Sequence, residues 1–323
     1  MTKLIIQLPA LNEAQSIADV MKRLPTTLDG VDCIETIVID DGSTDATGSI
    51  AREHGAHVVR HATPRGVGAA FRSGLLASMS RNADYIVTID ADGQFDPADI
   101  PKLMAPLLAG EADCVTASRF KDPAKVPVMP NAKRWGNDVI ARWVSRLAGQ
   151  SISDVSCGYR AYSRAAYLRL NLLGDFTYTH EVILSLMFAG LRVTEVPIVV
   201  RGVREHGTSR VANNLPRYAY RAASIILGMN RDYRPLQFFG CISWLLAGVG
   251  ALFVGFVSLH WVCTGAITPY KAFAFLGGAF WGAALIVGLV GLLAQMHVRL
   301  RSGVEDVMYR VRRLEQELDT RRD

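Results

Sequence analysis

Two long segments without a charged residue lie near the C-terminus and constrain the fold more than any other feature. They cover residues 238–259 and 272–294. At a rise of about 1.5 Å per residue, each segment is long enough for the roughly 30 Å hydrocarbon core of a bilayer. Because the connector, residues 260–271, is short, the pair predicts a hairpin of two transmembrane helices. The alternative is a helical hairpin buried inside a soluble protein.

The basic residues around these segments predict their orientation. Arg231 and Arg234 precede the first segment, Arg299 and Arg301 follow the second, and the connector carries Lys271 alone. The positive-inside rule therefore places both termini in the cytoplasm of a multi-pass protein of the inner (plasma) membrane. The expected division is a cytoplasmic folded domain over 1–212, an amphipathic juxtamembrane helix over 213–234, two transmembrane helices within 235–298 and a cytoplasmic basic heptad tail over 299–323.

Apolar runs typical of strands alternate with helical patterns through the first 120 or so residues. The expected strands are residues 4–8, 35–40, 56–60, 85–90 and 113–118, and the expected helices are residues 13–24, 44–54, 66–80 and 97–109. Such alternation predicts an α/β fold with a mostly parallel central sheet. Ser43 or Thr44 is a candidate N-cap of the second helix, Asp45 an acidic cap, and Asp96 with Pro97 starts the fourth helix.

Polar and acidic residues follow the ends of several of these strands. In open parallel sheets, ligands bind outside the carboxyl ends of the strands. This rule points to residues 9–13, 40–45 and 90–94 and to Arg119. Asp90 and Asp92 can both reach one hard divalent cation, and Gln94 offers a further oxygen, which fits Mg²⁺ or Mn²⁺. The alternative is a polar turn.

The charge balance indicates anionic partners. The net charge is +5, and residues 201–234 contain seven arginines against two acidic residues. Arginine and aromatic residues are interleaved from Leu215 to Asn230, a pattern typical of a helix in a membrane interface, although a solvated helix face is the alternative. Nucleic acid is not an expected partner, because it explains neither the acidic strand ends nor the uncharged segments.

The ordered motifs resemble a known family. Pro9-Ala10-Leu11-Asn12-Glu13, Asp40-Asp41-Gly42-Ser43-Thr44-Asp45, Asp90-Ala91-Asp92-Gly93-Gln94 and Ser118-Arg119-Phe120 are similar to the motifs of family 2 glycosyltransferases with the GT-A nucleotide-sugar-binding fold. Residues 154–160, residues 196–198 and the two apolar segments resemble the polyprenyl-phosphate branch of that family, which includes dolichyl-phosphate mannosyltransferase.

This resemblance implies site residues. Donor binding falls to Pro9, Leu11, Glu13, Asp40, Asp41, Asp90, Ala91, Asp92, Gln94, Arg204, Ser209 and Arg210. Asp40 would read the base, and the metal group would be Asp90, Asp92 and Gln94, with the last two favoured as direct ligands. The implied catalytic residues are Asp92, Arg119, Arg134 and Arg204, the last in a loop that closes over the phosphates. Leu11 departs from the family pattern, in which an aromatic residue is common, and residues 63–68 lack the usual asparagine and lysine.

The implied reaction transfers one sugar from a nucleotide-sugar, UDP more than GDP, to a polyprenyl phosphate with inversion, as a step in cell-envelope glycan biosynthesis. One alternative is a processive polysaccharide synthase of the same superfamily. Such enzymes carry a Gln-x-x-Arg-Trp motif, whereas Val139 precedes Arg142-Trp143 here. A catalytically dead, membrane-anchored binding protein is the other alternative.

Two patterns near the C-terminus concern helix association. Gly278 and Gly282 form a GxxxG pair. Such a pair either allows two helices to pack closely or reflects only the usual amino-acid composition of membrane-spanning helices. The tail residues Val304, Val307, Val311, Leu314 and Leu318 repeat with alternating spacings of three and four, which favours a short coiled coil and makes a homo-oligomer a candidate state.

Overall fold

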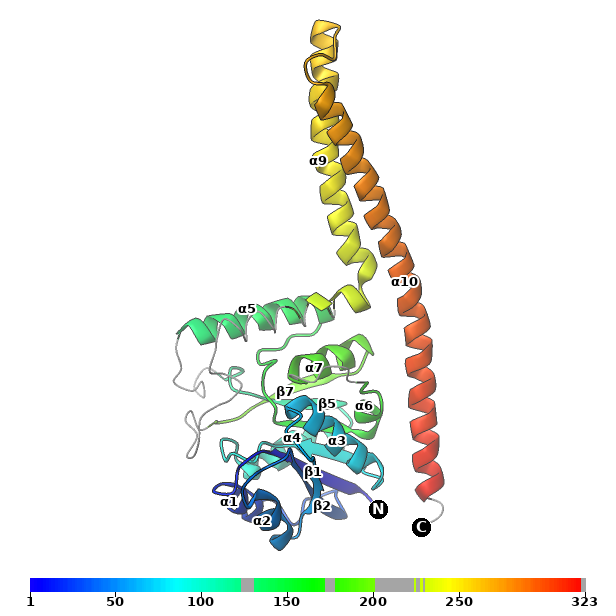
Figure 1. Cartoon of the computed structure of the whole chain (residues 1–323). Coiled ribbons are helices and arrows are strands. Elements are labelled where there is room, and N and C mark those ends of the chain that lie inside the picture. The colour runs from blue at the N-terminus through cyan, green and yellow to red at the C-terminus, as the bar shows by residue number, and fades with distance from the viewer. Residues whose placement is uncertain (123–130, 172–177, 201–223, 225–226, 229, 321–323) are drawn as a thin grey trace. The chain divides into compact units, whose positions relative to one another are not determined.

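The computed structural model of the chain describes residues 1–122, 131–171, 178–200, 224, 227–228 and 230–320 (Figure 1). The chain forms two compact units. The first contains residues Met1–Ile226 together with Glu305–Asp323, and the second contains Leu227–Val304. The C-terminal tail thus belongs to the same unit as the N-terminal α/β region.

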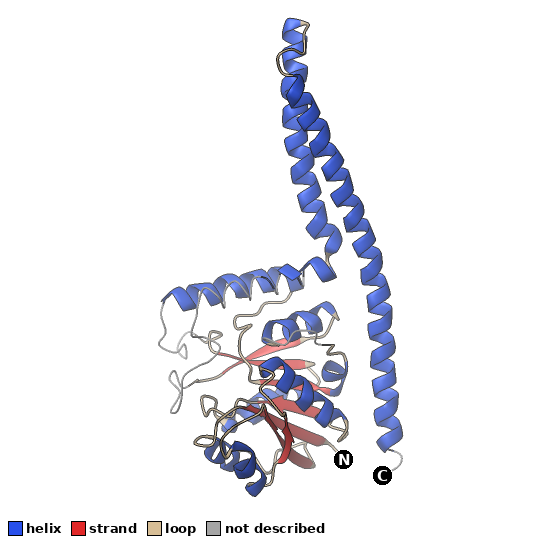
Figure 2. Cartoon of the chain, viewed as in Figure 1, coloured by secondary structure: helices blue, strands red, loops and turns tan. Residues whose placement is uncertain are grey.

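A seven-stranded sheet forms the centre of the first unit (Figure 2). Its strands are β1 (Lys3–Ala10), β2 (Cys33–Asp40), β3 (His57–Arg60), β4 (Tyr85–Thr88), β5 (Cys114–Ser118), β6 (Arg160–Ser163) and β7 (Val193–Pro197), in the spatial order β3-β2-β1-β4-β6-β5-β7. Only β6 runs antiparallel to its neighbours, β4 and β5. The expectation of a mostly parallel sheet is therefore confirmed.

Helices cover both faces of this sheet because side chains on a strand alternate between the faces. The helices are α1 (Ile17–Lys22), α2 (Thr47–Glu53), α3 (Val67–Met79), the 3-10 turn η1 (Pro97–Asp99), α4 (Ile100–Leu108), α5 (Asn131–Ala148), α6 (Arg164–Leu168) and α7 (Thr179–Phe188). Leu4, Ile6 and Leu8 of β1 face one core with α1, α2 and α4. On the other side, Phe71 of α3 stacks on Tyr178 at a centroid distance of 4.1 Å.

The caps of the helices differ in part from those expected. The prediction of Ser43 or Thr44 as the N-cap of α2 is wrong, because α2 begins at Thr47 and its N-cap position is Ala46. Ser43 Oγ instead accepts the Asn12 N–H, and the Thr44 N–H donates to the Asn12 side chain. Asp45 Oδ1 accepts the Thr47 N–H at 3.0 Å, which confirms its capping role. Asp96 accepts the Ala98 N–H at the start of η1, also as expected.

The second unit contains α9 (Pro235–Thr264) and most of α10 (Lys271–Thr320). Both helices are long and apolar enough to cross a membrane, as judged by length and composition. Only 11% of each apolar window is buried, which is unlike the core helix of a soluble protein. The predicted juxtamembrane helix over 213–234 falls largely outside the described residues.

Glycines let α9 and α10 approach closely. A Cβ on Gly250 would lie 2.9 Å from the carbonyl oxygen of Gly277, and a Cβ on Gly277 would lie 3.0 Å from that of Gly250. Trp281 Nε1 donates to the Ala247 carbonyl at 3.1 Å beside this crossing. By contrast, a Cβ on Gly278 or Gly282 would meet no described atom within 4 Å, so the GxxxG pair does not form the contact.

Candidate active site

The sheet gathers the predicted loops at one edge. Asp40 at the end of β2 is in register with Ala10 of β1, and residues 89–94 follow β4, which is parallel to β1. β6 runs in the opposite direction, so its first residue, Arg160, lies at this same edge, opposite Thr88 of β4. Pro9, Asp40, the 90–94 turn and Arg119 therefore share the carboxyl edge, where ligands bind in open α/β sheets.

Hydrogen bonds join the loop after β1 to the loop after β2. Asn12, at φ 56°, donates its N–H to Ser43 Oγ at 2.9 Å and accepts the Thr44 N–H at 2.8 Å. The Glu13 N–H donates to Thr47 Oγ1 at 2.8 Å. These bonds fix the turn that starts at Leu11. Helix α1 therefore begins at Ile17, whereas the sequence predicted a helix that begins at Glu13.

Asp40 and Asp41 are buried and hold the neighbouring loops. Asp40 accepts the Ser43 N–H at 2.8 Å and lies 3.5 Å from Arg60 Nε. The Asp41 carboxylate lies 2.6 Å from His61 Nδ1 and also accepts the N–H groups of Arg65 and Gly66. Both carboxylates are thus engaged inside the first unit, and Asp41 fixes residues 61–66.

The turn after β4 carries the predicted metal group. Asp92 is 4% exposed, and its Oδ1 accepts the Gln94 N–H at 3.0 Å, while Asp90 is half-buried. Ser16 Oγ lies 2.8 Å from the Ala91 carbonyl oxygen and 3.1 Å from Glu13 Oε2, and so connects this turn to the loop after β1. Two carboxylates and an amide oxygen on one turn fit a hard divalent cation. Within the described ranges, no three His, Cys, Asp or Glu side chains group as a metal site.

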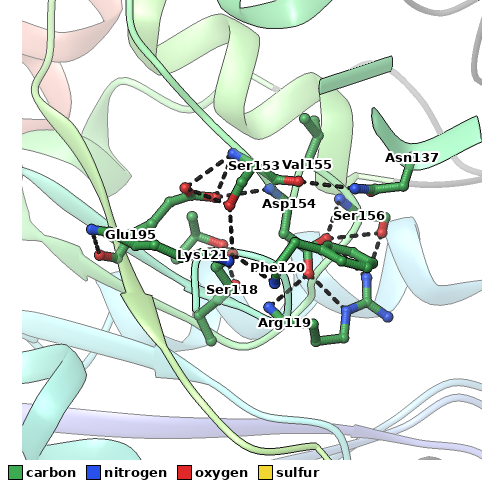
Figure 3. Close-up of polar contacts among 12 residues, drawn as sticks. Ser118, Arg119, Phe120, Lys121, Asn137, Ser153, Asp154, Val155, Ser156 and Glu195 are labelled. Carbon is green, nitrogen blue, oxygen red and sulfur yellow. Dashed lines mark hydrogen bonds and ion pairs between the residues drawn. The ribbon is translucent and has the colours of Figure 1, made fainter. Parts of the chain in front are cut away.

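Arg119, at the end of β5, is held by a buried carboxylate (Figure 3). Its Nε and one terminal nitrogen donate to the two oxygens of Asp154 at 2.7 and 2.8 Å, and it also donates to Ser156 at 2.6 Å. Burial alone would raise the pKa of the Asp154 carboxyl, but the Arg119 guanidinium and the hydrogen bonds lower it below its ordinary value. This two-point ion pair fixes the plane of the guanidinium.

A second buried acid fixes the segment that carries Asp154. Glu195 of β7 accepts the N–H groups of Ser153 and Asp154 at 2.9 and 2.8 Å (Figure 3). Ser153 Oγ is also 2.8 Å from Ser118 Oγ at the end of β5. The end of β5 and the middle of β7 thereby hold the 153–156 segment in place.

Arg160 and His180 lie behind this edge and are almost fully buried. Arg160 donates to the carbonyl groups of Val155 and Thr179 at 2.9 and 2.7 Å, which ties the segment after Asp154 to the start of α7. Burial, with the nearby charge of Arg160, lowers the pKa of His180 to about 4. His180 is therefore a neutral imidazole packed in the core.

Four predicted residues remain, and only one of them is among the described residues. Arg134 is exposed on α5. Arg204, Ser209 and Arg210 lie outside the described residues. Sequence reasoning assigned no role to Asp154, Glu195 or His61. A role for Glu195 could have been predicted from the sequence. It is an acidic residue within a short β-rich run, and burying such a side chain is costly unless it has hydrogen-bond partners.

Comparison with known proteins shows to which family the chain belongs. The family model described as glycosyl transferase family 2 matches residues 5–170. The undecaprenyl-phosphate mannosyltransferase of Micrococcus luteus is 30% identical over 221 residues, which cover 64% of this chain and 87% of that protein. The UDP-N-acetylglucosamine–dolichyl-phosphate N-acetylglucosaminyltransferase of Methanococcus voltae is 30% identical over 215 residues, 59% of this chain and 82% of that protein.

A solved structure shares the fold. Glucosyl-3-phosphoglycerate synthase from Mycobacterium tuberculosis, in complex with Mn²⁺, uridine diphosphate and phosphoglyceric acid, matches with a TM-score of 0.55 and 26% identity. The match covers 71% of this chain and 78% of that chain.

The chain belongs to glycosyltransferase family 2. The expected GT-A fold and the resemblance to the polyprenyl-phosphate branch of the family are confirmed.

Proposed function

We propose that this glycosyltransferase transfers a single sugar from a UDP-sugar to a polyprenyl phosphate, with inversion, and releases a polyprenyl-phosphate sugar. Both relatives described above are named for a polyprenyl-phosphate acceptor, but they differ in the sugar. The relatives therefore support the acceptor class more strongly than they support any one sugar. The UDP in the name of one relative and in the solved neighbour supports uridine over guanosine.

The observation that carries this proposal is the turn after β4. Asp90, Asp92 and Gln94 present oxygen ligands at the carboxyl edge, and Ser16 links their turn to the loop after β1. We assign these three residues to a Mg²⁺ or Mn²⁺ ion, which when bound would neutralise charge on the leaving nucleoside diphosphate. Pro9, Leu11, Glu13 and Asp40, on the adjoining loops, are assigned to the nucleoside.

The chemistry of the acceptor sets what the protein must supply. A phosphate monoester has a second pKa near 6, so it is already an anion at neutral pH. The attacking oxygen needs no general base and needs instead to be positioned and partly neutralised. Arginine suits this task, because its planar guanidinium binds phosphate through two parallel hydrogen bonds.

We assign the positioning of phosphate to Arg119, with Arg134, Arg204 and Arg210 as further cationic groups. The ion pair with Asp154 pre-orders Arg119, so that less conformational entropy is lost when an anion binds beside it. Direct displacement at the anomeric carbon inverts its configuration and leaves no sugar attached to the protein.

The same proposal places the enzyme in the inner membrane, with α9 and the first part of α10 as its two spans. The apolar windows of these helices have a mean hydropathy of 2.1. The arginines outside the spans favour a cytoplasmic position for both termini. The lipid acceptor and the active site would then meet at the cytoplasmic leaflet, where a precursor for cell-envelope glycans is made.

The test supplies membrane vesicles that contain the whole chain with a panel of UDP- and GDP-sugars, undecaprenyl or dolichyl phosphate, and Mg²⁺ or Mn²⁺. Mass spectrometry of the extracted lipid should show one added sugar. Asp92→Asn should lower this transfer by more than about 100-fold. Asp19→Asn is the matched control, because Asp19 is exposed on α1 and should leave transfer unchanged. Chains of several sugars, or an Asp92→Asn variant that remains fully active, would refute the proposal.

A further inference from the structure

The tail helix, residues 305–318 of α10, is anchored to the first unit by its polar face. Gln316 is 5% exposed and donates to the Met79 carbonyl at 3.2 Å and to the Tyr167 hydroxyl at 3.0 Å. Arg312 donates to the carbonyl groups of Leu168 and Leu170 at 2.9 and 3.1 Å. The Arg169 guanidinium lies 4.3 Å from the centre of the Tyr309 ring. The orientation of this helix is therefore fixed.

The opposite face of the tail helix, together with Val304 directly before it, is an exposed apolar stripe. Val304, Val307, Val311, Leu314 and Leu318 are each between 47% and 59% exposed. Their spacing places them at the a and d positions of a heptad repeat that begins at Val304. Tyr309 and Gln316 then fall at f positions and Arg312 at a b position, so the face that anchors the helix is opposite the a/d stripe.

We propose that the apolar stripe is the contact surface for a second copy of this chain, in a parallel two-stranded coiled coil. The charges beside the stripe support this partner. Arg310 is at a g position and Glu315 at the next e position, the two positions that form salt bridges between parallel strands. In a symmetric dimer this gives two complementary Arg310–Glu315 pairs.

The charges of the helix also argue against a membrane surface as the occupant. Residues 304–318 carry three basic side chains, Arg310, Arg312 and Arg313, and four acidic ones, Glu305, Asp306, Glu315 and Glu317. Helices that lie on anionic bilayers have a polar face rich in lysine and arginine. A mixture of both signs is instead typical of the flanks of a coiled coil.

The parallel orientation rests on the membrane insertion proposed above. The tail and the second apolar span belong to one continuous helix, α10. Two copies inserted with the same topology therefore present their tail helices in the same direction. Two heptads form a weak coiled coil in free solution, but confinement to one bilayer raises the effective concentration of the partners.

Cysteine cross-linking of the whole chain in vesicles tests this contact and its orientation. The exposed Cys241 and Cys263 are first replaced by Ser. Val307→Cys and Leu314→Cys, both at d positions, should each give a disulfide-linked dimer on mild oxidation. Arg313→Cys is the matched control, since Arg313 is 61% exposed but away from the stripe. We expect roughly tenfold more dimer at either d position than at 313.

The same experiment can overturn the proposal. Equal cross-linking at 313 and 314, or none at 314, excludes the stripe as the contact. In a parallel dimer each d position faces its own copy, so both cysteine variants should cross-link. In an antiparallel dimer a residue faces its own copy only near the symmetry axis. Cross-linking at only one of the two d positions would therefore exclude the parallel dimer. The readout does not depend on sugar transfer, so its failure is distinct from failure of the proposed reaction.

A charge reversal tests the predicted partner residues. Arg310→Glu or Glu315→Arg alone should reduce cross-linking at 314, and the double variant should restore it. Arg310 also pairs with Asp306 of its own helix at 2.9 Å, and the double variant does not rebuild that pair. Recovery would therefore report the contact between copies, and a double variant as weak as the single ones would contradict it.

Discussion

Asp154 is completely buried and remains charged because the Arg119 guanidinium, the Arg119 N–H and the N–H and hydroxyl of Ser156 donate to it. Removing the charge from one partner of a buried ion pair leaves the other uncompensated. We expect Asp154→Asn to lower the free energy of unfolding by about 3 kcal/mol, and to reduce sugar transfer because the Arg119 guanidinium loses its fixed orientation. Chemical denaturation and transfer assays measure the two effects.

An exposed ion pair provides the matched control for this prediction. Asp138 pairs with Arg142 at 2.8 Å on α5, and both side chains are more than half exposed. Asp138→Asn should change the free energy of unfolding by less than about 1 kcal/mol. If both variants lose the same stability, the Asp154–Arg119 pair does not have the role that we assign to it.

His180 predicts a specific dependence of stability on pH. Burial and Arg160 lower its pKa from the ordinary 6.5 to about 4. Between these values the unfolded chain binds more protons than the folded chain, so stability should fall as the pH is lowered from 6.5 towards 4. His180→Gln should remove up to about 1.4 kcal/mol per pH unit of this slope. The exposed His57→Gln is the control, and an unchanged slope in His180→Gln would contradict a neutral buried imidazole.

At the scale of single residues, the sequence predicted positions better than contacts. The acidic and polar strand ends were expected at one edge, and the strand register places them there. The partners of these residues were not visible, because they are distant in sequence. Asp154 lies 35 positions from Arg119, and Glu195 lies 41 positions from Asp154. The predicted N-cap of α2 was wrong for a similar reason, since Ser43 and Thr44 make hydrogen bonds with Asn12, more than 30 positions away.

At the scale of elements, apolar runs predicted the five parallel strands β1 to β5 to within about two residues at each end. The parallel β7 was not among the strands expected from apolar runs, and only its last residues fall in the 196–198 segment that the family resemblance singled out. The antiparallel β6 was missed, because it is four residues long and begins with a charged residue, Arg160. Burial of Arg160 is possible only because carbonyl groups from two other segments accept its hydrogen bonds. A local sequence pattern cannot show that carbonyl groups of distant segments will accept the hydrogen bonds of a buried arginine.

The packing of α9 against α10 gives a prediction with an adjacent control. Gly277→Val places new atoms against Val254 and the Gly250 carbonyl, so it should destabilise the helical hairpin by about 1–3 kcal/mol. A Cβ at Gly278 would meet no described atom within 4 Å, so Gly278→Val should be nearly neutral. Unfolding in mixed detergent micelles compares the two variants, and a larger loss for Gly278→Val would contradict the crossing.

At the scale of the whole molecule, one chain combines a GT-A unit with two helices suited to a membrane. The α/β fold and the two apolar helices were expected from the sequence, because hydrophobic periodicity and uncharged length are local properties. The GT-A class was expected from the resemblance of the strand-end motifs to a known family. The contacts that Gln316 and Arg312 of the tail helix make with the α/β region were not expected. The regular spacing of the apolar residues predicted a contact through the apolar stripe, whereas two polar residues that make such contacts have no recognisable spacing in the sequence.

The central claim is that an anionic phosphate on the lipid is the nucleophile. The most direct measurement offers the whole chain in vesicles two acceptors with the same isoprenoid chain, one a monophosphate and the other the free alcohol. With the same nucleotide-sugar and divalent ion, we predict that the sugar is transferred to the monophosphate and not to the alcohol. Transfer to the alcohol at an equal or higher rate would contradict the claim.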